Sequence, residues 1–244
     1  MNEHSWDIQV FESNLQHREV HVWRSWLDHS REDLNQIKSS LSDDEHDAAR
    51  KLHFERDRTR YVMSHGILRK ILSKYLSMPP DEIRFTRDEF GKPLLETNPG
   101  EIKFNLSHSE SMALFSFTQS SSIGVDIEHI HPIKDIHLIA KSFLSSEEMK
   151  AFLKIPKEMQ QGCFFRVWTR KEALSKAIGT GISMPLEQLE VGVNSEESPV
   201  LKFSNMKLLE PANWQLVDLN PAHNYVGAVA VENSEISLSL YTYP

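Results

Sequence analysis

The chain has 244 residues, with 27 Lys and Arg against 35 Asp and Glu, so its formal net charge is −8. Hydrophobic residues make up 39% of the chain and charged residues 25%, which is typical of a globular protein and excludes a disordered or fibrous one. The acidic balance argues against a general nucleic-acid binder, because such proteins usually carry a basic excess.

The chain shows no feature of secretion or membrane insertion. Its first residues contain neither the basic nor the apolar segment of a secretory signal, and no apolar run approaches the ~20 residues of a membrane span. Cys163 is the only cysteine, which excludes an internal disulfide and fits a reducing compartment. We therefore expect a cytoplasmic protein without membrane or nucleic-acid partners.

The first half predicts two helices followed by strands. Residues 42–45 (Ser-Asp-Asp-Glu) form a capping box, so a helix should begin there and reach about residue 55. Apolar residues at helical spacing predict a second helix through residues 61–76, which ends before Pro79. Strand-like runs cover residues 83–86, 102–106 and 112–118, with a turn at 90–93. The serine-rich residues 118–122 are the candidate linker.

The second half opens with a predicted strand at residues 123–127. Residues 145–148 (Ser-Ser-Glu-Glu) form another capping box before a short helix. A longer helix should cover residues 160–178 and end at Gly179, because glycine is the usual residue after a helix C-terminus. Further strands are expected near residues 189–193, 214–219, 225–231 and 236–241.

The two halves resemble each other at an offset of 106 residues. Residues 68–71 align with 174–177, and residues 77–83 align with 183–189. Each half therefore reads as helix, Ser-Met-Pro turn and strand, which indicates a duplicated unit. We predict an α+β fold of two similar tandem lobes that form a pseudo-dimer with the active site between them. The expected lobes are residues 1–120 and 121–244.

Two carboxylates lie close together in the sequence, one within the predicted strand at residues 123–127 and one directly after it. Asp126 and Glu128 are two positions apart, so both project to one face of the strand. Adjacent carboxylates repel unless a cation joins them, and oxygen ligands suit a hard cation such as Mg²⁺. The alternative interpretation is an edge strand with a polar outer face.

The long helix carries a second group of functional residue types. Trp168, Glu172 and Lys176 are four positions apart and share one helix face. Glu172 could supply a third carboxylate, and Lys176 a cation one turn later. The alternative is a surface Glu–Lys pair worth ~0.3 kcal/mol, with Trp168 in the core. Helix spacing alone favours that alternative.

Residues of the first half offer groups that bind anions. Ser107 and His108 end a predicted strand, where a hydroxyl and an imidazole can bind phosphate. They are unsuited to act as a nucleophile and its base, because adjacent residues of an extended chain point apart. Residues 50–60 carry five basic side chains, which suggests a small anionic ligand or an acidic partner. The alternative is a solvated helix face with ion pairs.

Four motifs occur in the order and spacing of one known family. They are residues 90–93 (Phe-Gly-Lys-Pro), 104–109 (Phe-Asn-Leu-Ser-His-Ser), 124–128 (Gly-Val-Asp-Ile-Glu) and 168–181 (Trp-Thr-Arg-Lys-Glu-Ala through Lys-Ala-Ile-Gly-Thr-Gly). From about residue 41 to residue 231, the chain resembles the 4′-phosphopantetheinyl transferases of the monomeric, two-lobed type that activates surfactin synthetase.

The resemblance implies an enzyme that transfers phosphopantetheine from coenzyme A to a serine of an apo acyl or peptidyl carrier protein. Adenosine 3′,5′-bisphosphate would leave. Asp126, Glu128 and Glu172 match the family residues that hold Mg²⁺ against the pyrophosphate. Lys176 matches the lysine that touches the phosphates. Such an enzyme would act as a monomer and recognise the acidic helix of its carrier.

The resemblance also places the nucleotide end of the coenzyme on the N-terminal lobe. The matching positions there are Lys92, Pro93, Ser107 and His108, and Arg60 matches an arginine that grips the 3′-phosphate. The family's early lysine-rich stretch is replaced here by acidic and small residues at 45–48, and only Arg50 and Lys51 partly substitute for it. Coenzyme contacts of residues 45–51 are therefore not assigned.

The serine hydroxyl must lose a proton, so the resemblance implies a nearby base. Glu148 matches a family glutamate proposed for that role, with Glu128 or a metal-bound water as alternatives. Glu148 is also the last residue of a capping box, and a purely capping role is the competing interpretation. If Glu148 is the base, Glu148→Gln should keep the melting temperature and slow turnover by ~10²-fold or more.

Two other functions fit parts of the pattern. A Mg²⁺-dependent nuclease could use Asp126, Glu172 and a lysine, but such sites usually carry Glu-x-Lys on a strand, and the chain is acidic. A catalytically silent module that binds carrier proteins would not need a cluster of carboxylates.

Overall fold

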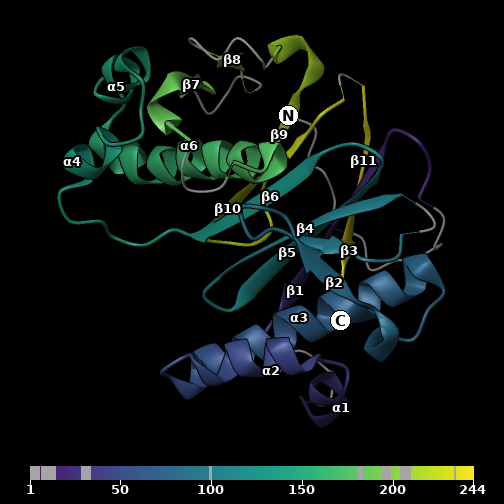
Figure 1. Cartoon of the computed structure of the whole chain (residues 1–244). Coiled ribbons are helices and arrows are strands. Elements are labelled where there is room, and N and C mark those ends of the chain that lie inside the picture. The colour runs from purple at the N-terminus through teal and green to yellow at the C-terminus, as the bar shows by residue number, and fades with distance from the viewer. Residues whose placement is uncertain are drawn as a thin grey trace. The chain divides into compact units, whose positions relative to one another are not determined.

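The computed structural model describes most of the chain (Figure 1). The described residues are Trp6, 15–28, 34–98, 101–180, 184–193, 199, 201–203, 210–233 and 235–244. They divide into two compact units. Unit 1 contains residues up to 88, residues 93–120 and residues 237–244, whereas unit 2 contains residues 89–92 and 121–236. The predicted lobes 1–120 and 121–244 differ from these units at residues 89–92 and 237–244.

Unit 1 is built on a mixed four-stranded sheet in the order β11-β1-β5-β4. Its strands are β1 (Glu19–Trp26), β4 (Ile102–Ser109), β5 (Met112–Gln119) and β11 (Ser237–Thr242). β11 pairs with β1 in parallel, and the other neighbours are antiparallel. β2 (Phe85–Arg87) and β3 (Pro93–Leu95) form a separate hairpin. The last strand of the chain therefore completes the sheet that the first strand begins.

The described helices of unit 1 are α1 (Leu34–Ser39), α2 (Asp43–Arg50) and α3 (Glu55–Leu76), followed by the short 3-10 helix η1 (Pro80–Glu82). The predicted capping box of α2 is confirmed, since Ser42 and Glu45 each hydrogen-bond the other's backbone. α3 ends at Ser77, whose left-handed backbone returns its N–H to the Ser73 carbonyl. Side chains of α3 share one core with the aromatic residues of β1, β4 and β5.

Unit 2 is a three-stranded antiparallel sheet with a long helix against it. The strands β6 (Ile123–His129), β9 (Gln215–Leu219) and β10 (Tyr225–Val231) lie in the order β6-β10-β9. Helix α6 (Lys157–Ile178) runs along β6 and β10 (Figure 1). The shorter elements are α4 (Ile136–Ala140), α5 (Ser146–Phe152), η3 (Leu186–Gln188), η4 (Pro211–Asn213), β7 (Leu189–Glu190) and β8 (Lys202–Phe203).

The two units repeat one succession of elements, as the sequence predicts. α3 and α6 both have 22 residues, and each ends on a left-handed residue, Ser77 or Gly179. The 3-10 helices η1 and η3 that follow are 106 positions apart. The predicted α+β class with two similar lobes is therefore confirmed. The sheets differ, however, because unit 1 gains β1 and β11, and unit 2 has no equivalent of that pair among its described strands.

The capping box of α5 is also confirmed, with Ser145 and Glu148 as its two members. The predicted strands at residues 189–193 and 83–86 are shorter or shifted, because β7 has two residues and β2 begins at Phe85. Among the described residues, no helix is both long and apolar enough to cross a membrane.

Candidate functional site

Asp126, Glu172 and Lys176 meet where β6 lies against α6. Lys176 Nζ donates to Asp126 Oδ1 at 2.6 Å, and the Asp126 side chain is buried. Burial raises the pKa of the Glu172 carboxyl above its usual value, the negative charge of Asp126 raises it further, and the Lys176 ammonium opposes the rise. The strand and helix motifs of the sequence therefore form one electrostatically coupled group in unit 2.

Glu128 lies two residues after Asp126 on β6 and is half-buried. Its strand position places it opposite Val226, and Asp126 lies opposite Ala228. Within the described part of the chain, no three His, Cys, Asp or Glu side chains are gathered as a metal cluster. The donor set nevertheless suits Mg²⁺, because Asp126 and Glu172 repel each other and carboxylate oxygens are ligands of a hard cation. The three-carboxylate site stays a prediction.

Glycine at position 124 explains how closely β6 approaches α6. A Cβ atom built on Gly124 would lie 2.1 Å from the Ala173 carbonyl oxygen and 2.4 Å from the Ala177 nitrogen. Both atoms belong to the helix backbone, so no side chain could rotate away to make room. The glycine of the strand motif thus permits a backbone-to-backbone contact that brings the carboxylates of β6 near those of α6.

Lys92 lies at this same contact. Its Nζ donates to the Ile123 carbonyl at 2.8 Å and to the Lys176 carbonyl at 2.7 Å. Residues 89–92 accordingly count with unit 2, and Gly91 makes the turn with a φ of 88°. The coenzyme contact expected for Lys92 stays a prediction, and the hydrogen bonds observed here are made to the backbone.

Glu148 is buried inside unit 2, at the start of α5. Its Oε2 accepts from the Ser145 N–H at 3.0 Å and from Lys171 Nζ at 2.6 Å, while Oε1 accepts from the Val191 N–H at 2.8 Å. Lys171 also donates to the carbonyls of Phe143, Leu186 and Leu189. Burial lowers the pKa of Lys171 despite the opposing effect of Glu148.

Unit 1 contains the counterpart of this arrangement. Glu45, the last residue of the first capping box, accepts from Arg69 Nε at 2.8 Å. Arg69 in turn donates to the carbonyls of Pro80 and Ile83. These two carbonyls are 106 positions before Leu186 and Leu189, the acceptors of Lys171. Sequence reasoning identified neither the Glu45–Arg69 pair nor the Glu148–Lys171 pair. In the long helices the sequence repeat is visible only as Leu-x-Lys, and Arg69 and Lys171 do not occupy equivalent positions of that repeat.

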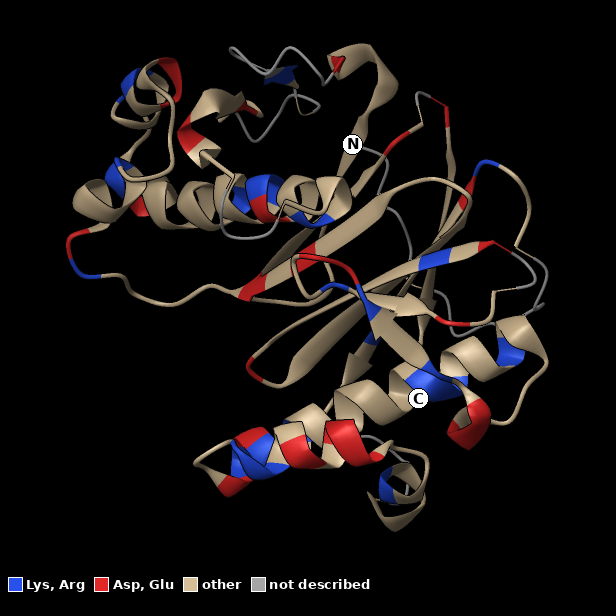
Figure 2. Ribbon diagram, viewed as in Figure 1, with Lys and Arg blue, Asp and Glu red and all other residues tan. Residues whose placement is uncertain are grey.

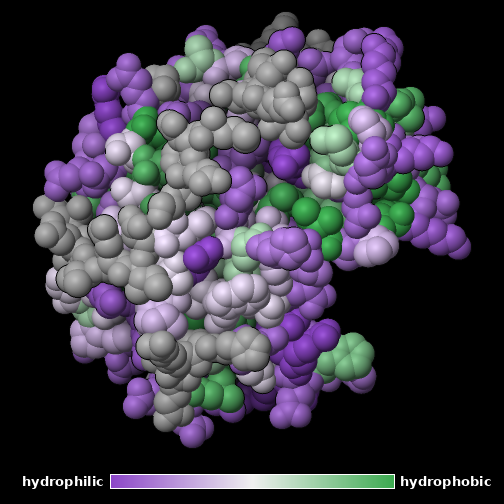
Figure 3. Space-filling view, turned by 180° about the vertical axis from the view of Figure 1, so that it is seen from behind, coloured by the Kyte–Doolittle hydropathy of each residue, from purple (hydrophilic) through white to green (hydrophobic). Residues whose placement is uncertain are grey.

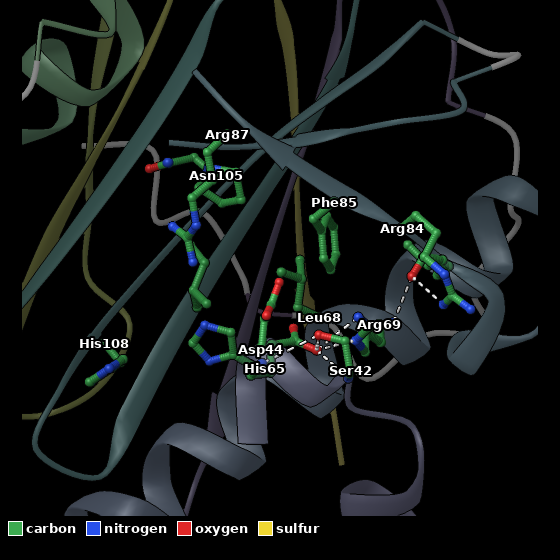
Figure 4. Close-up of a pocket in the computed structure, with 14 residues that line it drawn as sticks. Ser42, Asp44, His65, Leu68, Arg69, Arg84, Phe85, Arg87, Asn105 and His108 are labelled. Carbon is green, nitrogen blue, oxygen red and sulfur yellow. Dashed lines mark hydrogen bonds and ion pairs between the residues drawn. The ribbon is translucent and has the colours of Figure 1, made fainter. Parts of the chain in front are cut away.

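A pocket of about 350 Å³ lies in unit 1 (Figure 4). Among its lining residues are basic or imidazole side chains, Arg84, Arg87, His65 and His108, and apolar ones, Leu68, Ile83 and Phe85. Burial lowers the pKa of His65 to about 4, so this ring is neutral at pH 7. The basic groups suit the phosphates of a nucleotide, although Asp44 and Glu45 also line the pocket and the Arg69 guanidinium lies over the Phe85 ring.

Two of the expected nucleotide-binding residues, Pro93 and His108, line this pocket, together with Asn105 from the same motif. Ser107 is buried, and His108 is exposed on the opposite face of β4, as strand alternation requires. Sequence reasoning missed His65 and Arg87. Both lie outside the quoted motifs, and only the fold brings them to His108.

Arg60 is not among the residues that line the pocket. Its guanidinium binds Asp28 at 2.7 Å and Glu110 at 2.9 Å, and these carboxylates raise its pKa. Figure 2 shows acidic residues along α2 with basic ones near its end, and residues of both signs at the start of α3. Further pairs there join Arg50 to Asp47 and Arg56 to Asp57. The ion-paired helix face, the simpler of the two interpretations, describes most of the basic residues at 50–60.

The chain was compared with families and proteins of known identity. The family model described as 4′-phosphopantetheinyl transferase superfamily matches residues 122–230, and the one described as 4′-phosphopantetheinyl transferase, N-terminal, matches residues 24–119. The chain is 37% identical to the 4′-phosphopantetheinyl transferase HetI of Nostoc sp., over 95% of each chain. It is 30% identical to the 4′-phosphopantetheinyl transferase Sfp of Bacillus subtilis, over 88% of this chain and 93% of that one. It is also 30% identical to psf-1 of Bacillus pumilus, over 80% and 81%.

Proposed function

The chain belongs to the 4′-phosphopantetheinyl transferases, enzymes that move the phosphopantetheine group of coenzyme A to carrier proteins, and we propose that it does so with Mg²⁺ and releases adenosine 3′,5′-bisphosphate. The observation that carries this proposal is the meeting of Asp126, Glu172 and Lys176 at the contact of β6 and α6. The family model of the superfamily spans all three residues.

Asp126, Glu172 and Glu128 would hold the metal ion. A bound Mg²⁺ would offset the charge of the pyrophosphate as its phosphorus is attacked. Lys176 forms an ion pair with Asp126, and we infer that its ammonium contacts the phosphates. In the reaction, the serine oxygen forms a bond to the β-phosphorus of coenzyme A, and the bond from that phosphorus to the nucleotide's phosphate oxygen breaks.

The contacts of Glu148 bear on which residue takes the serine proton. Both of its oxygens accept hydrogen bonds from within unit 2, and one of them binds the Lys171 ammonium. A carboxylate paired in this way is a weak proton acceptor, because protonation would leave a buried lysine without its counter-charge. We therefore propose that Glu148 has a structural role and is not the base.

The nucleotide end of coenzyme A would bind in the pocket of unit 1. His108, Arg87 and Arg84 offer cationic or imidazole donors to phosphate oxygens. Pro93 and Ser107 belong to the same part of unit 1. For Arg60 to grip the 3′-phosphate, the phosphate would have to displace Asp28 or Glu110.

An apolar surface of unit 2 is a candidate contact for the carrier protein. Four large apolar side chains are exposed there: Leu138 and Ile139 on α4, Leu153 directly after α5, and Met159 on α6. Figure 3 shows apolar residues at the surface of the molecule among polar ones. Exposed lysines at 141 and 154 lie nearby in the sequence, whereas Lys150 is paired with Glu147 and the exposed Glu158 adjoins Lys157. Apolar anchors with surrounding positive charge suit the acidic helix of a carrier protein.

One experiment tests the proposed function. The protein is incubated with coenzyme A, Mg²⁺ and an apo carrier protein, and the carrier is weighed by mass spectrometry. The carrier should gain one phosphopantetheine group only when Mg²⁺ is present, and adenosine 3′,5′-bisphosphate should appear in equal amount. A carrier of unchanged mass would contradict the proposal and leave a silent binding module, whereas cleavage of added DNA would favour a nuclease.

The metal site is tested by Asp126→Ala and Glu172→Ala in the same assay. Each should fold and lose transfer, because the remaining carboxylates would hold the metal ion poorly and the charge of the pyrophosphate would not be offset. Lys157→Met, an exposed change at the other end of α6, is the control and should keep full turnover. Turnover near that of the wild type in either alanine variant at ordinary Mg²⁺ would show that the assigned residues are wrong.

A further inference from the structure

Lys92 links β6 and α6 at residues that are far apart in the sequence. Its ammonium donates one hydrogen bond to the first residue of β6, at the Ile123 carbonyl, and one to the last turn of α6, at the Lys176 carbonyl. The distances of 2.8 and 2.7 Å are those of charge-assisted hydrogen bonds. Lys92 itself is half-buried.

The Lys176 carbonyl is a favourable acceptor for a cation. It is one of the last four carbonyls of α6, which have no partner within the helix. The negative end of the helix dipole lies here, so an ammonium at this position is attracted to the helix as well as to the oxygen. Lys92 therefore caps the C-terminus of α6 and binds it to β6.

The same two elements carry every predicted metal ligand. β6 supplies Asp126 and Glu128, and α6 supplies Glu172. Gly124 sets the lower limit of their separation, because its missing Cβ allows backbone contact with α6. Lys92 contacts both elements beside this point, at the residue before Gly124 on the strand and about one turn after Glu172 on the helix, and so opposes their separation.

We propose that Lys92 is a positioning residue: its ammonium sets the distance between β6 and α6 and so holds Asp126 and Glu172 close enough to share a divalent cation. This inference rests on the metal site of the proposed function. It assigns Lys92 a role different from the nucleotide contact that the family resemblance implies. Loss of the ammonium should weaken metal binding even when coenzyme A is absent.

The test measures metal and coenzyme binding separately, without turnover. Mn²⁺ is the metal probe, because it takes the same oxygen ligands as Mg²⁺ and its free form is quantified by electron paramagnetic resonance. Coenzyme A binding is measured by calorimetry in the absence of metal. The variants are Lys92→Met, Lys92→Arg, Asp126→Ala and, as a control of equal charge on α6, Lys157→Met.

Lys92→Met should weaken Mn²⁺ binding by about 10- to 100-fold, the scale seen when residues that orient metal ligands are removed. Its affinity for coenzyme A should stay unchanged, and so should both affinities of Lys157→Met. Lys92→Arg keeps the charge and the donors on a longer side chain, so its Mn²⁺ affinity should be intermediate. If Lys92→Met does not fold, as judged by circular dichroism, the Lys92→Arg result decides.

The inference would be overturned if Lys92→Met bound Mn²⁺ as tightly as the wild type. If Lys92→Met does not fold, the same result in Lys92→Arg would overturn it. A loss of coenzyme A affinity with Mn²⁺ binding intact would do the same and would restore the nucleotide contact. Asp126→Ala separates this failure from that of the proposed function. If Asp126→Ala still binds Mn²⁺ normally, the metal site itself is misplaced and the role of Lys92 is overturned with it.

Discussion

Glu45 and Glu148 each do two things at the beginning of a helix. Each closes a capping box, and each binds a buried cation, Arg69 or Lys171, that also donates to two carbonyls after the long helix. Each cation ties its long helix to the 3-10 helix that follows and to the residue directly after that 3-10 helix. Because the arrangement occurs in both units, its simplest role is structural.

This duplication changes the expected behaviour of Glu148→Gln. A neutral amide still caps α5 but leaves the Lys171 ammonium buried without a counter-charge. We expect the free energy of unfolding to fall by about 3 kcal/mol, the scale for breaking a buried ion pair. The matched variant Glu45→Gln should lose a similar amount in unit 1. Urea denaturation followed by circular dichroism measures both changes.

Turnover separates the structural role of Glu148 from a role as base. At a temperature where Glu148→Gln is folded, we expect the rate of transfer to stay within about tenfold of the wild type, whereas loss of a general base costs 10²-fold or more. The acidic limb of the pH–rate profile should also persist. A folded variant with a much lower rate and no acidic limb would return the role of base to Glu148.

His65 makes the stability of unit 1 depend on pH. Its folded pKa of about 4 lies below the ordinary value of 6.5, so between these values the unfolded chain binds more protons than the folded one. The free energy of unfolding should therefore fall as the pH drops from 6.5 to 4. His65→Phe keeps the ring that stacks on Tyr61 but does not titrate, and it should show a shallower fall. Equal slopes in urea titrations at several pH values would contradict this.

At the scale of secondary-structure elements, Gly124 decides how closely β6 packs against α6. Gly124→Ala would drive a Cβ into the backbone of α6, at 2.1 Å from the Ala173 carbonyl oxygen. Because backbone atoms cannot rotate away, we expect a loss of about 1–3 kcal/mol or more in the free energy of unfolding, with weaker metal binding.

The matched control is Gly162→Ala, which lies in α6 itself. A Cβ at Gly162 would meet nothing within 4 Å, and alanine is the better helix former, so the variant should gain about 0.5–1 kcal/mol. Thermal unfolding of both variants gives the comparison. Gly124 lies in a strand against the backbone of α6, whereas Gly162 lies in α6 with open space beside it, and similar stability of both variants would contradict the backbone contact.

At the level of the whole molecule, the end of the chain completes unit 1. β11 pairs in parallel with β1 from Glu19 to Arg24, and Tyr241 stacks on Trp23 at 4.6 Å. Removing residues 237–244 exposes that edge of β1 and the otherwise buried Trp23. Hydrogen exchange should then quicken in β1 and leave α6 and β6 protected. Removing only the exposed Pro244 is the control, and unchanged protection of β1 in the longer deletion would refute the role of β11.

Local patterns in the sequence determined the elements that depend on near neighbours. Both capping boxes, the end of α6 at Gly179 and the strands β5 and β10 follow from residues within a few positions of one another. The motifs at residues 124–128 and 168–181 likewise suggested the family and the carboxylates near α6. The repeat predicted two similar lobes because it preserves the order of helix, turn and strand.

Only the tertiary structure decided which distant residues meet. The sequence assigned no element to residues 19–26, because the partner that makes β1 an inner strand lies more than 200 residues later. Lys92 binds two backbone carbonyls, and Lys171 neutralises Glu148, although neither partner is near in sequence. A buried ammonium must find acceptors wherever the fold supplies them, and spacing along the chain carries no record of those acceptors.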